Sequence, residues 1–152
     1  MKKFLPLVAV LLCNFANAYE ISGAKPIDKL ASEQAKVKDS KKLLCIVYKG
    51  ADDSCPHCAA AAENGVKAVR GSAECVVITE AQVKDKAVMD KLPSNVQKML
   101  KEQPTNAWVS FTVYDADLTK VIAASSRESL ETDKKATKQF SETVHAAKTA
   151  LK

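Results

Sequence analysis

The sequence predicts an α/β domain with a central mixed sheet of about four strands, flanked by helices. Apolar runs at residues 43–48 and 75–79 are typical of strands that are buried on both faces. Segments whose apolar residues recur at helical spacing separate these runs and favour a parallel arrangement. Apolar and polar residues alternate over 107–114 before a short turn, which indicates an antiparallel strand pair near the C-terminus.

Residues 1–18 have the composition of a signal peptide rather than of a folded element. Two lysines precede an apolar run over 4–12, and residues 16–18 read Ala-Asn-Ala, the small residues that a signal peptidase recognises. The run is shorter than the roughly 20 residues that span a bilayer. We therefore expect cleavage before Tyr19, a periplasmic or secreted protein, and one domain over 19–152.

The first half of the domain is predicted as helix, strand, helix, strand. The first helix covers 26–38 and begins with a proline, whose missing N–H is harmless in the first turn. The strand at 43–48 leads into a second helix over about 55–70, with Ser54 or Asp53 as its N-terminal cap. The second strand, at 75–79, then lies beside the first.

The second half is predicted as helix, hairpin, helix. Residues 82–102 are expected to be helical in two pieces, because Pro93 ends the first piece and can begin the second. The strand at 107–114 is followed by a turn and by a partner strand over 120–124. A long final helix is expected over about 128–150, with an apolar face that includes Phe140 and Val144.

The motif Cys55-Pro56-His57-Cys58 lies between the first buried strand and an alanine-rich helix. Unpaired backbone N–H groups and the helix dipole stabilise a thiolate at such a position, and the thiolate is the reactive form of cysteine. A CxxC pair is also half of many zinc sites. At a strand-to-helix junction within this element order, however, it favours disulfide exchange.

The CxxC position and the element order together resemble the thioredoxin superfamily over essentially the whole of 19–152. Gln103-Pro104-Thr105 precedes the alternating strand and looks like the family's cis-proline segment, which packs beside the dithiol and orients the substrate backbone. The resemblance implies a thioredoxin-like fold and a substrate-binding role for these three residues. Pro56-His57 resembles the intervening pair of periplasmic disulfide oxidases of the DsbA type, although the chain lacks room for their inserted helical domain.

The resemblance and the helix position assign separate roles within the motif. We expect Cys55 to be the exposed nucleophile and Cys58, one helical turn later, to be the resolving thiol. His57 can favour the Cys55 thiolate by its charge or by a hydrogen bond, and Asp52 with its acidic neighbour opposes this. His57 could instead be an exposed histidine without influence on the thiols. A stabilised thiolate favours an oxidising couple.

We therefore expect an exported thiol–disulfide oxidoreductase that exchanges disulfides with cysteine-containing proteins. Its redox centre is the Cys55–Cys58 disulfide, with no further cofactor and no metal, and a membrane or exported partner recycles it. We expect a monomer that does not bind nucleic acid, because the net charge of +5 is spread among mixed charges. Oxidase, reductase and isomerase share these residues, so the direction stays open.

Other functions fit the same motif. The two cysteines and His57 could hold a soft ion such as Cu(I), or serve in the assembly of a metal site. The dithiol could also be vestigial in a binding protein, or a purely structural disulfide.

Cysteines and aromatic residues outside the motif are interpreted as structural. Cys45 and Cys75 lie on strands that we expect to be parallel neighbours, and we favour two buried thiols over a disulfide between them. His145 on the last helix is expected to be structural or exposed to solvent. Trp108 and Tyr114 are expected to share one strand face and to cover the sheet.

Overall fold

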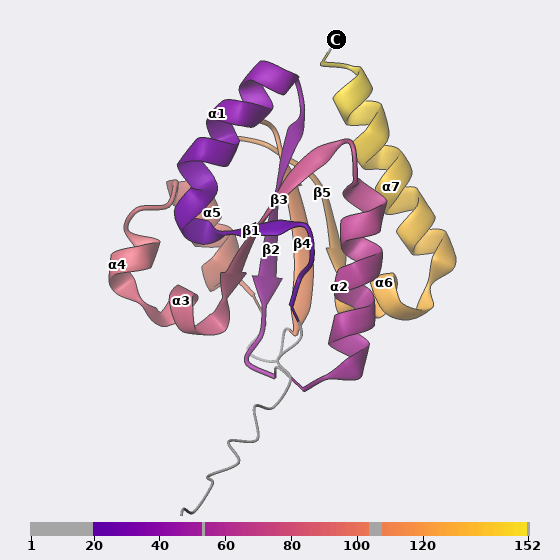
Figure 1. Cartoon of the computed structure of the whole chain (residues 1–152), viewed down its shortest axis with the longest axis horizontal. Helices are drawn as coiled ribbons and strands as arrows, with labels where there is room; N and C mark the ends of the chain where they lie inside the picture. Colours follow the sequence, from indigo (N-terminus) through magenta and orange to yellow (C-terminus); the bar gives the residue numbers. More distant parts are fainter. Residues whose placement is uncertain (1–19, 53, 104–107, 152) are drawn as a thin grey trace, which may run out of the picture.

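The chain forms a three-layer α/β structure, seen in a computed structural model that describes residues 20–52, 54–103 and 108–151 (Figure 1). The signal-peptide prediction for residues 1–18 lies outside the described residues. The strands are β1 (Ala24–Pro26), β2 (Leu43–Lys49), β3 (Ala73–Thr79), β4 (Val109–Tyr114) and β5 (Val121–Ser126). The helices are η1 (Ile27–Lys29, a 3₁₀ turn), α1 (Leu30–Ser40), α2 (Pro56–Val69), α3 (Glu80–Lys84), α4 (Lys86–Met89), α5 (Ser94–Lys101), α6 (Arg127–Thr132) and α7 (Lys134–Thr149).

The sheet is mixed, as predicted, and has the strand order β1-β3-β2-β4-β5. The first three strands of this order are parallel, whereas β4 pairs antiparallel with both β2 and β5. The sheet has five strands rather than the four expected, because residues 24–26 form an edge strand beside β3. The prediction that Pro26 begins a helix was wrong: Pro26 ends β1, where an edge strand tolerates a residue without an N–H.

Two predicted helices are divided in the structure. The segment expected to be helical before Pro93 forms α3 and α4, which meet at Asp85, a residue with extended backbone whose carboxylate accepts from the Ala87 N–H at 2.8 Å. The final helix is divided at Asp133 into α6 and α7. The Asp133 carboxylate accepts from the backbone N–H groups of Lys135 and Ala136, each at 2.9 Å, and so begins α7.

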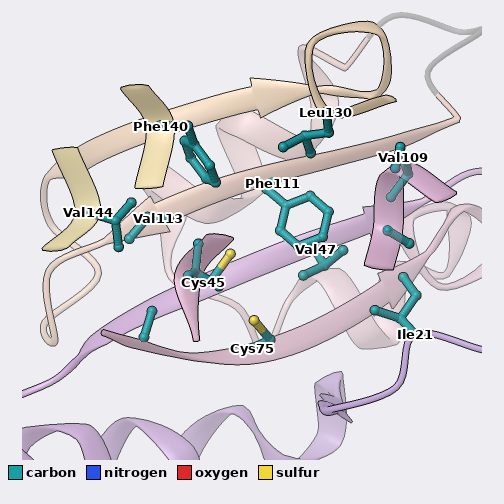
Figure 2. Close-up of a cluster of buried hydrophobic side chains, with 14 of the residues drawn as sticks. Ile21, Cys45, Val47, Cys75, Val109, Phe111, Val113, Leu130, Phe140 and Val144 are labelled. Carbon is teal, nitrogen blue, oxygen red and sulfur yellow. The ribbon is translucent and has the colours of Figure 1, made fainter. Parts of the chain in front are cut away.

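Each face of the sheet has its own apolar core. One face packs against η1, α1 and the α4–α5 region, through residues such as Leu44, Ile46 and Tyr114. The other packs against α2, α6 and α7, and Phe111 lies fully buried within its apolar cluster (Figure 2). The described part of β4 sends Val109, Phe111 and Val113 to the second face, in agreement with the predicted alternation. No described helix is both long and apolar enough to cross a membrane.

Helix α2 approaches the sheet closely at Gly65. A Cβ at Gly65 would come within 2.4 Å of the Phe111 ring, so this helical position has room only for glycine unless the ring moves. At the other end of the helix, Gly71 follows the C-cap with a φ of +79° and turns the chain toward β3. Phe111 and Gly65 thus fix the depth at which α2, and the dithiol at its start, sits against the sheet.

Candidate functional site

Cys55 is the N-cap of α2, and its own thiol is the capping group. Its Sγ accepts a hydrogen bond from the Cys58 backbone N–H at 3.2 Å, and Pro56 occupies the first helical position, where no N–H is needed. The sequence predicted Ser54 or Asp53 as the cap. The Ser54 side chain bonds to Asp52 instead, and Asp53 lies outside the described residues. A backbone donor and the helix N-terminus both favour negative charge on the Cys55 sulfur.

Cys58 lies one turn later and is fully buried, whereas Cys55 is half-buried. Burial, followed by the hydrogen bond and charge of Cys55, raises the pKa of Cys58 to about 12. Arg127 acts in the opposite direction and lowers this pKa, and Asp52 raises it slightly. The two thiols are therefore unlike: one is capped and accessible, and the other is a buried, protonated thiol in contact with the first.

The His57 side chain contacts α6. Its Nδ1 pairs with the Glu131 carboxylate, and no hydrogen bond joins it to Cys55 in the described structure. The other Glu131 oxygen accepts from the Arg127 guanidinium at 3.2 Å, and that guanidinium lies 4.0 Å from the centre of the Trp108 ring. A continuous network of charged and aromatic side chains therefore lies beside the motif, formed by His57, Glu131, Arg127 and Trp108.

The segment predicted to bind substrate is only partly described. Gln103 is held by its side chain, which accepts from the Ser110 hydroxyl at 3.1 Å and donates to the Met99 sulfur at 3.2 Å. Pro104 and Thr105 lie outside the described residues, as does the predicted cis bond. After the gap, the Trp108 carbonyl accepts from the Gly50 N–H at 2.5 Å, so the chain rejoins the sheet beside the loop that leads to Cys55.

The remaining sequence-based interpretations have mixed outcomes. Cys45 and Cys75 are parallel register partners on β2 and β3 and are buried free thiols, as predicted. His145 has a structural contact, with its Nδ1 3.5 Å from the Ser72 hydroxyl. The prediction for Trp108 was wrong: Tyr114 is buried in the sheet, but the Trp108 side chain is 37% exposed and packs on Arg127 instead.

The described residues contain no group of three or more His, Cys, Asp or Glu side chains arranged to hold a metal ion. Within the motif, the His57 Nδ1 is paired with the Glu131 carboxylate. A ligand set made of both cysteines and the His57 Nδ1 is therefore not formed among the described residues.

Sequence reasoning did not find Arg127 and Glu131. Their spacing of four residues is the usual signal for an ion pair on a helix, and they do form one. Nothing in the sequence, however, places that pair next to His57, which is 74 positions away in the chain. Only the packing of α6 against α2 brings the two segments together.

The arrangement can carry out thiol–disulfide exchange, since an accessible capped thiol and a buried second thiol lie within one helical turn. Comparisons with protein-family models, with curated proteins and with solved structures find no match to this chain.

Proposed function

We propose that the protein is an exported thiol–disulfide oxidoreductase with a thioredoxin-like fold. The observation that carries the proposal is the contact between the Cys55 Sγ and the Cys58 N–H at the start of α2. It gives the accessible thiol a donor that stabilises its thiolate and keeps the second thiol within reach. The element order and the junction of β2 with α2 support the thioredoxin-like assignment.

In the proposed reaction, the Cys55 thiolate of the reduced protein attacks a substrate disulfide and releases one substrate thiolate. Cys58 then loses its proton and attacks the Cys55 sulfur, which releases the second substrate thiolate and closes the Cys55–Cys58 disulfide. The same steps in reverse donate a disulfide to a reduced protein. A membrane or exported redox partner would restore the starting state.

The test is exchange between the oxidised protein and a reduced peptide that carries two cysteines. We expect two-electron transfer in the unaltered protein and none in Cys55→Ala. When reduced Cys58→Ala is instead given the same peptide in its disulfide form, Cys55 should be trapped in a mixed disulfide with it. Cys45→Ala is the matched control and should exchange at the unaltered rate. Exchange that survives Cys55→Ala, or tight Cu(I) binding without any trapped species, would overturn the proposal.

The direction of the reaction depends on the reduction potential. Pro56-His57 resembles the intervening pair of periplasmic disulfide oxidases, so we expect a couple more oxidising than thioredoxin, which has a potential of about −270 mV. Equilibration with glutathione buffers followed by mass spectrometry measures this potential. A value at or below that of thioredoxin would contradict the oxidising assignment while leaving the exchange chemistry intact.

A further inference from the structure

The protein contains a second pair of cysteines that the proposed reaction does not use. Cys45 and Cys75 are directly opposite each other in the parallel pairing of β2 with β3. Both side chains belong to the apolar cluster on the α2 side of the sheet, together with Val47 and Phe111 (Figure 2). Cys45 is fully buried and Cys75 is 4% exposed.

The backbone spacing at this pair already suits a disulfide. Neighbouring strands lie about 4.7–4.9 Å apart, and the Cα atoms of disulfide-bonded cysteines lie about 4.4–6.8 Å apart. The two thiols also interact: burial first, and then a hydrogen bond to Cys75, raise the pKa of Cys45 well above its usual value. The two side chains thus lie on the same face of the sheet, at directly paired positions of neighbouring strands.

A cavity gives small molecules a route to this pair. It has a volume of about 660 Å³ and lies between α2 and the segment that precedes β1. Ala59, Val66 and Arg70 line it from the helix, Gly23 lines it from the segment, and Cys75 contributes to its wall. Sites of about 300–1,000 Å³ accommodate small organic molecules. Cys45 is absent from the wall, so Cys75 is the thiol that a reagent meets first.

We propose that Cys45 and Cys75 form a second dithiol–disulfide couple, which a small-molecule disulfide entering this cavity oxidises. The Cys75 thiolate attacks the small disulfide, forms a mixed disulfide and releases one small thiolate. Cys45 gives its proton to that thiolate and attacks the Cys75 sulfur, which releases the second thiolate and closes the bond. Two protein thiols are oxidised and one small disulfide is reduced to two thiols. The couple does not depend on the function proposed for Cys55 and Cys58.

The test uses the purified Cys55→Ala/Cys58→Ala variant, in which the second pair holds the remaining thiols of residues 19–152. The folded protein is incubated with glutathione disulfide, quenched in acid, denatured and alkylated, and its mass is measured. We expect two alkylated cysteines before oxidation, none after it, and a peptide that links Cys45 to Cys75. Two cysteines that stay alkylatable, or a glutathione adduct on Cys75 that never resolves, would overturn the proposal.

Two further variants in this background test the order of attack and the route. Additional Cys45→Ala should leave one stable glutathione adduct on Cys75, because the resolving thiol is gone. Additional Ala59→Phe narrows the cavity and should slow oxidation about tenfold, since access limits such exchange. Ala60→Phe, on the exposed neighbouring position of the same helix, is the control and should have no effect. Equal rates in these last two variants would exclude the cavity route, and circular dichroism verifies that each variant is folded.

Discussion

At the residue scale, the two cysteines of the motif differ because of where α2 begins. Cys55 precedes the first helical residue and uses its sulfur as the cap, whereas Cys58 is turned into the apolar core. The Cys58 backbone N–H donates to the Cys55 sulfur and so connects the half-buried thiol to the fully buried one. An asymmetry of this kind is what a nucleophile and a resolving thiol require.

The asymmetry predicts selective alkylation of the reduced protein. Iodoacetamide at neutral pH should modify Cys55 and leave Cys58 unmodified, because burial raises the pKa of Cys58 to about 12. Peptide mapping after a timed reaction measures both sites. Comparable labelling of Cys58 in the folded protein would contradict the assigned roles, and labelling in denaturant, where both should react, is the control.

Arg127 is predicted to help Cys58 act as the resolving thiol. Its charge lowers the pKa of Cys58, and its side chain is only 18% exposed, so solvent screens it incompletely. Arg127→Gln should slow release of the mixed disulfide by about fivefold, or about 1 kcal/mol, without changing the first attack by Cys55. Rapid-quench measurement of the mixed disulfide separates the two steps. Arg127→Lys keeps the charge and should retain most of the release rate; if it behaves like Arg127→Gln, the charge is not the cause.

At the element scale, α2 joins the chemistry to the packing of the sheet. The helix carries the dithiol at its first turn and approaches Phe111 of β4 at Gly65. Helix α6 then supplies the charged groups beside that first turn, through Arg127 and Glu131. The site is thus assembled from two helices that pack on the same face of the sheet.

Gly65→Ala is predicted to destabilise the protein although alanine favours helix formation. The new Cβ would overlap the Phe111 ring, and overpacking costs about 1–3 kcal/mol, whereas the helix gains about 1 kcal/mol. We expect a net loss of up to about 2 kcal/mol in urea unfolding. The double variant Gly65→Ala/Phe111→Leu should lose less than the sum of the two single changes. Simple additivity would show that the contact with Phe111 is not the cause.

The sequence was sufficient to predict elements with strong local signals. The apolar runs of β2 and β3 and the CxxC junction were identified correctly, because burial and spacing leave a clear pattern there. The edge strand β1 was missed, since three residues that end in proline carry no strand pattern of their own and pair only because β3 lies beside them. The contact between His57 and Glu131 was missed for the same reason, because it depends on how distant segments pack.

At the scale of the whole molecule, the buried thiols connect folding stability to pH. The folded chain keeps the proton on Cys58 up to about pH 12, whereas the unfolded chain releases it near the ordinary value of 9.0. Burial also raises the pKa of Cys45. Between about pH 9 and pH 12, the folded state binds more protons than the unfolded state. The free energy of unfolding therefore has its full value below about pH 9 and decreases as the pH rises.

This linkage predicts that the reduced protein becomes easier to unfold at alkaline pH. The free energy of unfolding from urea titrations should decrease steadily from pH 9.0 upward, and the slope should be smaller in Cys58→Ala, which lacks one of the titrating groups. Oxidation of Cys55 with Cys58 removes the same group and should have a similar effect. A stability that is constant or rises over this range would contradict the prediction.

Because Arg127 contacts Trp108, we expect tryptophan fluorescence to report on the state of the dithiol. Trp108 is the only tryptophan in the sequence, and the guanidinium stacked on its ring is the same group whose charge acts on Cys58. A change in charge at the dithiol therefore reaches the indole through a single side chain. Tryptophan emission should follow the oxidation state of the site in real time, without any attached dye.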